Sequence, residues 1–228
     1  MKGKCFYINL DKSISRRESI ENIVNNLKID SKRMPAIEYS PGTVGCLLSH
    51  HKCMEIILQE DPQYDWFLIL EDDAILNSKY TFEDVNLLIS KIDKYLEHTP
   101  LIMLGAHVNA AEEHKNVPKK HPIYTEFLIG NGTCNTTHAY VVSKKYAKVL
   151  KEAWDIQIKI CLKTVESLKQ SLKPPISLIT DCGADHTPWA GLQKRDKWFV
   201  LQDMFVQDGL LNETRTVRDK LFFDQIKE

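Results

Sequence analysis

The chain has no excess of charge of either sign, because it carries 30 Lys and Arg against 31 Asp and Glu, a formal net charge of -1. The basic surplus that usually accompanies binding to nucleic acid or to anionic membranes is therefore missing. No apolar run approaches the roughly 20 residues that a membrane-spanning helix needs. Residues 1–4 lead straight into a predicted strand without the apolar core of a signal peptide, so we expect a cytoplasmic protein.

Cysteine pairs are missing as well. The six cysteines are scattered and form no CxxC pair, so neither a zinc site nor a disulfide framework is indicated, and we interpret them as reduced, mostly buried small hydrophobes. No linker divides the 228 residues, which suffice for one sizeable core. We therefore expect a single domain over residues 1–228, whose C-terminal part from about 205 is a flap or tail over the product site.

Strand and helix patterns alternate along the chain. Short apolar runs predict strands at residues 5–10, 66–70, 101–104, 127–129, 139–142 and 176–179. Apolar residues at helical spacing predict helices from about 15, from 44 to 61, at 82–96 and from 143 to about 172. Ser15 and Glu18 have the spacing of a capping box. This alternation predicts an α/β fold with a mostly parallel central sheet covered on both faces.

An acidic run, Glu71, Asp72 and Asp73, directly follows the apolar strand at 66–70. Carboxylates beside a hydrophobic core are costly unless they are paired. In parallel sheets, ligands bind at the carboxyl ends of the strands. Two carboxylates at such an end can bind Mg²⁺ or Mn²⁺ and leave positions open for a diphosphate. The alternative is a solvated turn or a helix N-cap.

A second polar group follows the first predicted strand. Asn9 and Asp11 can hydrogen-bond a base or a ribose, and Arg16 or Arg17 can meet a phosphate. The alternative is a capped turn followed by exposed helix charges.

The segment from Gly45 to His50 is a third candidate. Its glycine permits close approach of the backbone to a ligand, and Ser49 and His50 can supply hydrogen bonds. Ser49 and His50 do not form a nucleophile pair by themselves, because neighbouring side chains on a helix point in different directions.

Four segments in order resemble glycosyltransferase family 25, which includes bacterial lipooligosaccharide galactosyltransferases and collagen hydroxylysine galactosyltransferases. They are INLDKSISRRE, GCLLSHHKCMEIIL, FLILEDDA and THAYVVSKKYAKVL, and the resemblance covers roughly residues 4–150. It implies a GT-A type, Rossmann-like fold and inversion at the anomeric carbon. It also implies a UDP-sugar donor, usually UDP-galactose or UDP-glucose, and a divalent cation, Mn²⁺ or Mg²⁺.

The resemblance also implies which residues form the site. Those expected near the donor are Asn9, Leu10, Asp11, Arg16, Gly45, Ser49, His50, Glu71, Asp72 and His138. Asp73 and Asp72 are the implied metal ligands, and Glu71 has a supporting role. For His138, the alternative is a satisfied, partly buried histidine.

Beyond residue 150 the resemblance is weaker. In the family a Pro-hydrophobic-Asp element usually follows soon after the fourth segment, whereas here the predicted helix continues to about residue 172 before such residues appear. Asp181 or Asp185 is the candidate base that deprotonates the acceptor hydroxyl, although both can instead line a Gly-containing turn. His186 can complete the metal shell. Trp189 and Trp198 either stack on a sugar ring or pack in the core.

The sequence therefore predicts a metal-dependent inverting glycosyltransferase. It would move galactose or glucose from a UDP-sugar to a hydroxyl of a glycan, a glycolipid or a collagen-like acceptor such as hydroxylysine. We expect no nucleic-acid partner and no integral membrane segment, with a peripheral membrane location if the acceptor is lipid-linked. The alternatives are a nucleotidyl or phosphoryl transferase and a catalytically silent module that binds a nucleotide-sugar or a glycan.

Overall fold

The structure is a computed structural model, and its elements alternate along the chain. The described residues are 1–60, 62–105, 107–108, 119–124, 127–129, 134–169, 182–185, 187–201 and 203–208. The helices are α1 (Ile14–Asn25), α2 (Gly42–Gln59), α3 (Phe82–Ile89), α4 (Ile92–Leu96), α5 (Lys144–Lys169) and α7 (Thr187–Asp196). The strands are β1 (Gly3–Asn9), β2 (Asp30–Pro35), β3 (Trp66–Glu71), β4 (Ala74–Leu76), β5 (Leu101–Met103), β6 (His107–Val108), β7 (Lys119–Lys120), β8 (Leu128–Ile129), β9 (Cys134–Asn135), β10 (Ala139–Ser143), β11 (Phe199–Val200) and β12 (Phe205–Gln207).

The main sheet has eight strands in the order β2-β1-β3-β10-β5-β11-β8-β7. β1 pairs in parallel with β2 and β3, and β11 pairs in parallel with β5. β10 is antiparallel to both β3 and β5, and β8 is antiparallel to both β11 and β7. Six of these strands therefore share one direction, and β10 and β8 run the other way. The predicted α/β fold with a mostly parallel sheet is confirmed.

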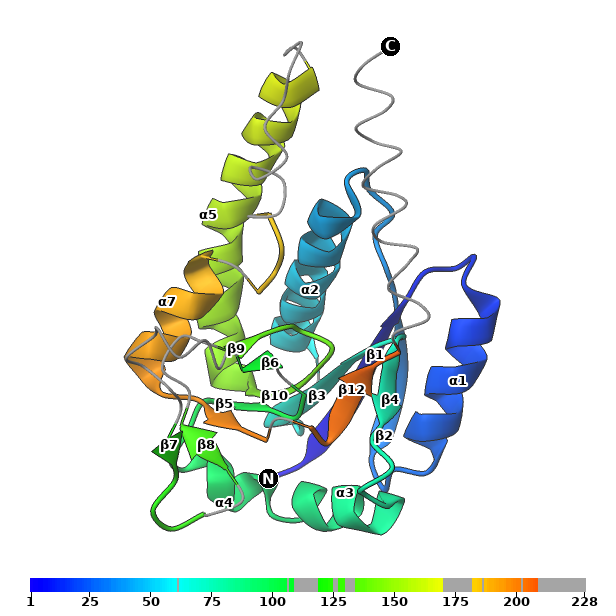
Figure 1. Cartoon of the computed structure of the whole chain (residues 1–228), viewed down its shortest axis with the longest axis vertical. Helices are drawn as coiled ribbons and strands as arrows, with labels where there is room; N and C mark the ends of the chain where they lie inside the picture. The colour runs from blue at the N-terminus through cyan, green and yellow to red at the C-terminus, as the bar shows by residue number, and fades with distance from the viewer. Residues whose placement is uncertain are drawn as a thin grey trace.

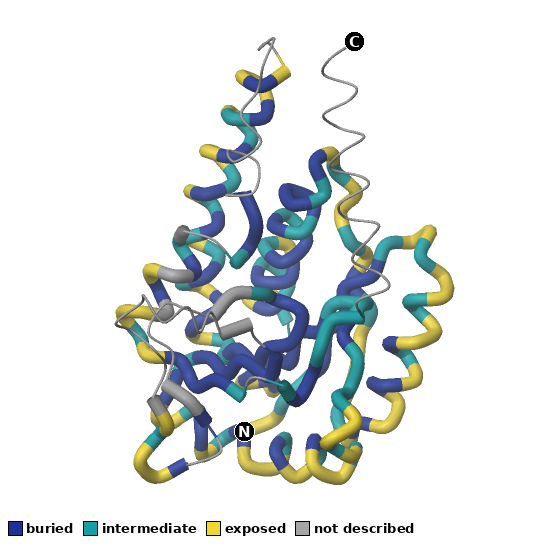
Figure 2. The backbone as a smooth tube through the Cα atoms, viewed as in Figure 1, coloured by how far each residue is buried: buried dark blue, intermediate teal, exposed yellow. Residues whose placement is uncertain are grey.

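Both faces of the sheet are covered by helices (Figure 1). On one face Phe67 and Ile69 belong to a core with residues of α2, α5 and α7. On the other face Leu68 and Leu70 belong to a core with residues of α1, α3 and α4. The central strands of the sheet are accordingly coloured as buried in Figure 2. Burying a large apolar side chain contributes about 1.5–3 kcal/mol, so β3 is anchored from both sides.

Most of the predicted elements are present. The strands predicted at 5–10, 66–70, 101–104, 127–129 and 139–142 are β1, β3, β5, β8 and β10. The two long predicted helices are α2 and α5. The strand predicted at 176–179 lies outside the described residues.

Two details of the helix predictions are wrong. α1 begins at Ile14, and its N-cap is Ser13, whose side chain makes no capping bond. Ser15 already lies inside the first turn, where it cannot cap the helix. The helix predicted at 82–96 is divided into α3 and α4, because the chain turns after Ile89. A capping box does form in this region, between Thr81 and Asp84.

β2 is an element that the sequence pattern does not reveal. Its residues are mostly polar and exposed, with Met34 as the buried exception. β2 lies at the edge of the sheet and pairs with β1 alone. An edge strand buries few of its side chains, so few of its residues have to be apolar. Its position brings Arg33 beside the end of β1, opposite Tyr7.

The chain after β11 returns to the acidic run. β12 pairs antiparallel with β4, which follows that run directly, and Gln207 lies opposite Ala74. The flap or tail predicted from about residue 205 stays a prediction, since residues 209–228 lie outside the described part. None of the helices in the described part of the chain combines the length and the apolar character that crossing a membrane requires.

Candidate active site

The acidic run lies at the carboxyl end of β3, in the middle of the sheet. Glu71 is the last residue of β3, and Asp72 and Asp73 form the turn into β4. β1 runs parallel to β3 with Ile8 opposite Glu71, so both strands end at the same edge of the sheet. The structure thereby brings the segment after β1 beside the two aspartates.

Asp72 is held by two donors from that segment. Nδ2 of Asn9 donates to its Oδ2 at 2.7 Å, and the guanidinium of Arg16 lies 3.3 Å from its Oδ1. The Arg16 and Asp72 side chains are only 16% and 11% exposed, so water screens this ion pair little. Burial raises the pKa of Asp72, and the contacts with Asn9 and Arg16 oppose this rise without cancelling it.

Arg33 fixes the orientation of the Asn9 amide. Its Nε donates to Oδ1 of Asn9 at 3.1 Å, and its terminal nitrogen donates to the Asn9 backbone oxygen at 3.1 Å. An arginine can only donate hydrogen bonds, so Oδ1 of Asn9 must face Arg33 and the amide N–H groups must face Asp72. Nothing in the sequence pattern marked Arg33, because β2 itself was not predicted.

Leu10 and Asp11 form the turn after β1. The backbone oxygen of Leu10 accepts a hydrogen bond from Ser13 at 2.9 Å. The Asp11 side chain is 82% exposed and accepts from Arg33 at 2.5 Å. Both residues therefore lie beside the Asn9–Asp72 contact, and their predicted contacts with a donor stay predictions.

Asp73 has a buried carboxylate oxygen, Oδ1, to which the described residues offer no hydrogen-bond partner. Its other oxygen lies 3.5 Å from Nε2 of Gln207. Burial and the negative charges of Glu71 and Asp72 raise the pKa of Asp73 to about 7. A divalent cation would supply the missing partner and offset the repulsion, and oxygen ligands suit Mg²⁺ and Mn²⁺. Asp72 and Asp73 therefore fit such an ion.

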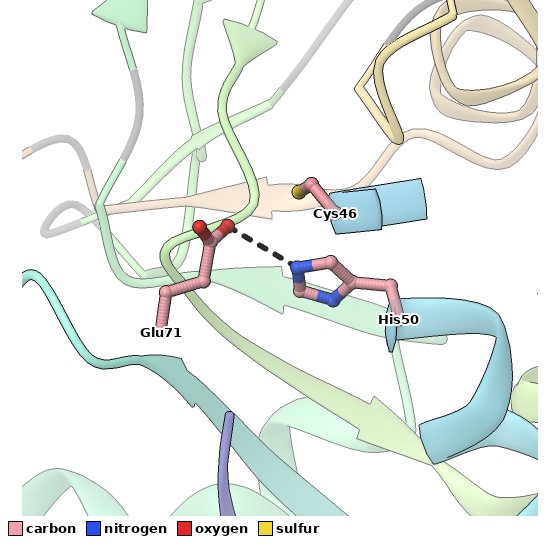
Figure 3. A group of neighbouring side chains, drawn as sticks. All are labelled: Cys46, His50 and Glu71. Atoms are coloured by element: carbon pink, nitrogen blue, oxygen red, sulfur yellow. Dashed lines mark hydrogen bonds and ion pairs between the residues drawn. The ribbon is translucent and has the colours of Figure 1, made fainter. Parts of the chain in front are cut away.

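Glu71 belongs to a buried chain of hydrogen bonds. Nε2 of His50 lies 3.2 Å from Oε1 of Glu71 (Figure 3). Thr137 donates to the same oxygen at 2.6 Å. On its other side, Nδ1 of His50 lies 3.0 Å from the hydroxyl of Tyr140. Burial opposes ionisation of Glu71, but the contacts with His50 and Thr137 outweigh it and lower the pKa of this carboxyl. Glu71 is thus an anchored carboxylate between α2 and β10.

His138 is buried behind the acidic run. Its Nε2 donates to the backbone oxygen of Phe205 at 3.0 Å, which places a proton on Nε2 because a carbonyl can only accept. The His138 backbone oxygen accepts from Glu71 at 2.9 Å. Gly105 makes room for the ring, since a Cβ at this position would lie 2.1 Å from Nε2. His138 therefore joins β12 to the site, and its contact with a donor stays a prediction.

The sequence of the chain matches the model of a known protein family. The model of Glycosyltransferase family 25 (LPS biosynthesis protein) matches residues 37–161, which is more than half of the chain. The chain belongs to glycosyltransferase family 25. The resemblance found in its sequence segments is thereby confirmed, and the enzyme is a glycosyltransferase.

A solved structure supports the fold assignment. A glycosyltransferase involved in the glycosylation of the major capsid of PBCV-1 aligns with 97% of this chain and 98% of its own, with 16% identity and a TM-score of 0.52. A UDP-glucose pyrophosphorylase complexed with UDP-glucose aligns with 99% of this chain and 100% of its own, with 10% identity and a TM-score of 0.47. The first of these likenesses supports a GT-A type fold. No curated protein sequence matches the chain.

In this family 25 glycosyltransferase, Gly45 and Ser49 hold the segment that follows β2 against α2. The hydroxyl of Ser49 accepts from the Ile37 backbone at 2.8 Å and donates to the Gly45 oxygen at 2.7 Å. A Cβ at Gly45 would lie 2.8 Å from the Ile37 oxygen. The group that approaches Gly45 closely is therefore the backbone of Ile37. Contacts of Gly45 and Ser49 with a sugar donor stay predictions.

Of the candidate bases, only Asp185 lies within the described residues; Asp181 and the candidate metal ligand His186 do not. Oδ2 of Asp185 accepts from the backbone N–H of Thr136 at 2.9 Å. Thr136 has a φ of 92°, which is uncommon for a β-branched residue and needs such an anchor. Asp185 is thereby connected to the segment just before β10, which contains Thr137 and His138.

The turn that contains Asp185 is attached to α5. Nε1 of Trp154 donates to the Ala184 oxygen at 3.1 Å, and Nε2 of Gln157 donates to the Gly183 oxygen at 2.6 Å. These residues are buried on the face of α5 that looks toward the sheet. The long helix therefore positions one of the two candidate bases.

The hypothesis that Trp189 and Trp198 form a sugar-stacking platform is wrong. Both side chains are completely buried, and their rings meet at a centroid distance of 4.6 Å in an edge-to-face arrangement. Nε1 of Trp198 donates to the hydroxyl of Tyr146 at 3.1 Å. Both tryptophans are core residues that pack against α5, so neither ring has an exposed face on which a sugar could stack.

Proposed function

We propose that this family 25 enzyme transfers a hexose, galactose or glucose, from a UDP-sugar to an acceptor hydroxyl with inversion at the anomeric carbon. The acceptor oxygen attacks the anomeric carbon while the bond to the diphosphate breaks on the opposite face. The acceptor proton passes to a base of the protein, and UDP leaves. This displacement requires that both reactants be held in line, which is the main contribution of the binding site.

One observation carries the proposal of metal dependence. Asp73 has a buried oxygen without a hydrogen-bond partner among the described residues, beside the firmly held Asp72. Mn²⁺ or Mg²⁺ bound by these two residues would neutralise the charge that develops on the leaving diphosphate. His186 remains a proposed further ligand.

The donor would lie along the edge of the sheet where β1 and β3 end. Arg16 can pair with a phosphate oxygen, because it already lies at this edge with its guanidinium beside Asp72. Asn9, Leu10 and Asp11 would contact the ribose or the base. Glu71 and His50 would support the aspartates from behind, since both are tied into the buried hydrogen bonds with Thr137 and Tyr140.

The base would come from the segment that follows α5. Asp185 and Asp181 are both proposed, and an inverting reaction needs only one of them. For Asp185, the support is its anchored position beside Thr136, next in sequence to the residue that bonds Glu71. The acceptor would be a glycan, a glycolipid or a collagen-like hydroxylysine; the family description, an LPS biosynthesis protein, favours the first two.

The test is release of UDP and formation of a glycosylated product from a panel of UDP-sugars and acceptors, with Mn²⁺, Mg²⁺ or EDTA. We expect transfer that needs the cation and falls at least about 100-fold in Asp73→Asn. Glu97→Gln, which alters an exposed carboxylate away from the site, is expected to match the wild type. Nucleotide transfer instead of sugar transfer, or tight donor binding without turnover, would overturn the proposal.

A further inference from the structure

Three side chains of mixed chemistry meet where α2 crosses the end of β3. The thiol of Cys46, a ring nitrogen of His50 and a carboxylate oxygen of Glu71 all lie within 4.8 Å of one another. Figure 3 shows the sulfur, the ring and the carboxylate turned toward a common region. We propose that Cys46, His50 and Glu71 bind a zinc ion at a site separate from the oxygen site of Asp72 and Asp73.

The fold supplies this geometry from two elements. Cys46 and His50 are four residues apart on α2, a spacing that places side chains on the same face of a helix one turn apart. β3 delivers Glu71 to that face at its last position. The sequence pattern gave no sign of zinc because the cysteines form no CxxC pair, and the third ligand comes from a distant strand.

The distances need only a small adjustment. Zinc bonds of about 2.0–2.3 Å in a tetrahedron place neighbouring ligand atoms about 3.3–3.8 Å apart. Nε2 of His50 and Oε1 of Glu71 are already 3.2 Å apart. The largest separation, within 4.8 Å, therefore has to close by about 1 Å, which rotation of the Cys46 side chain can supply. Cys46 is partly exposed, so this ligand is not sealed from solvent.

The hydrogen bonds around His50 are compatible with a ligand role. In the neutral ring, Nε2–H donates to Glu71 and Nδ1 accepts from the hydroxyl of Tyr140. When zinc binds, the Cys46 thiol loses its proton to solvent, and the His50 proton moves to Nδ1, from which it donates to the Tyr140 oxygen. Tyr140 is fully buried and would orient the imidazole as the second partner of a metal-bound histidine. Thiolate and imidazole ligands select zinc over Mg²⁺ and Mn²⁺.

The first experiment uses Co²⁺ as an optical stand-in for zinc. We expect a thiolate-to-cobalt charge-transfer band in the wild type that zinc removes by competition. The band should be absent in Cys46→Ser, with zinc affinity lowered at least about 100-fold. It should persist in Cys53→Ser, which alters a buried thiol of the same helix, and in Asp73→Asn. Absence of the band in the wild type, or its persistence in Cys46→Ser, overturns the proposal.

A second experiment needs no variant. Zinc should protect Cys46 of the wild-type protein from alkylation by iodoacetamide, as measured by peptide mass spectrometry, whereas Mg²⁺ should not. Equal alkylation with and without zinc contradicts the site. Both experiments measure metal binding alone, so their failure is distinct from a failure of sugar transfer.

Discussion

Asn9 donates a hydrogen bond to Asp72 over 2.7 Å, and this bond joins the ends of the parallel strands β1 and β3. Arg33 holds the other side of the same amide, so the donor cannot turn away from the carboxylate. The charge of Asp72 is therefore supported by a chain of donors that begins at the edge strand β2.

Replacing Asn9 by Asp tests this chain. The amide donor becomes an acceptor that faces the Asp72 carboxylate in a site that is almost completely buried, with Asn9 only 1% exposed. We expect a loss of about 1–3 kcal/mol in the free energy of unfolding at neutral pH. Urea unfolding measures it. Asn22→Asp adds the same charge on the exposed face of α1 and should cost less than about 0.5 kcal/mol. An equal loss in both variants would refute the role of Asn9.

Replacing Asp73 by Asn should stabilise the cation-free protein. The raised pKa of Asp73, about 7, means that the folded state disfavours its charge, because the group is buried beside Glu71 and Asp72. A neutral amide removes this penalty, so we expect a gain of about 1–3 kcal/mol in EDTA at neutral pH. Thermal unfolding in EDTA measures it.

The same variant should lose the response to cations. Mn²⁺ that binds only the folded state raises the unfolding temperature of the wild type, and the rise in Asp73→Asn should be much smaller. The exposed-site variant Glu97→Gln should keep the full rise. If Asp73→Asn gains as much from Mn²⁺ as the wild type, the ion does not bind at Asp73.

Gly105 should tolerate no side chain. An added Cβ would lie 2.1 Å from Nε2 of His138 and 2.3 Å from the backbone oxygen of Phe205. Because both neighbours are buried and one contact is with a backbone oxygen, we expect Gly105→Ala to cost about 1–3 kcal/mol. Gly191→Ala is the matched control: nothing lies within 4 Å of its added Cβ on α7, so it should gain about 0.5–1 kcal/mol. Urea unfolding of both variants checks the opposite signs.

Glu60 should make stability depend on pH in the acid range. Its carboxylate accepts from Lys32 at 2.7 Å and from Lys4 at 3.0 Å. The hydrogen bond from Lys32 lowers the pKa of Glu60; partial burial opposes this shift, and Lys4 adds to it. A lowered folded pKa contributes stability above the unfolded pKa, and this contribution is lost as the pH falls through the folded value.

Glu60→Gln should therefore be less stable than the wild type by about 0.5–1.5 kcal/mol at neutral pH. The difference should shrink as the pH falls below about 4. Urea unfolding at several pH values measures it. Glu18→Gln, at an exposed position of α1, should show no such trend. A difference that is constant with pH would contradict the ion pairs of Glu60.

The predictable part of the fold consists of elements whose own residues carry the signal. β3 is buried along its whole apolar length, and α2 and α5 have long apolar stripes. β2 was not predictable, because an edge strand with one partner needs few apolar residues. The antiparallel direction of β10 was also hidden, since a buried strand has the same composition in either direction.

The candidate site also has a part that the sequence predicts and a part that it does not. The acidic run at the end of a strand was visible, because three adjacent carboxylates after an apolar run are unusual in a sequence. The partners of those carboxylates were only partly visible. Arg33 was missed as a member of the site, and Tyr140 was seen only as part of the fourth segment, without its contact to His50. Each of the two reaches the site through a residue far away in the chain.

The sequence by itself determined the alternation of strands and helices, the family and the position of Glu71, Asp72 and Asp73 at a strand end. These properties depend on local order, on apolar periodicity and on motifs that are contiguous in the chain. The tertiary structure decided that Asp72 is held by Asn9 and Arg16, that Asp73 keeps an oxygen without a partner among the described residues, and that Glu71 turns toward His50. Such distinctions arise from packing between distant segments, which gives three neighbouring acids three different environments.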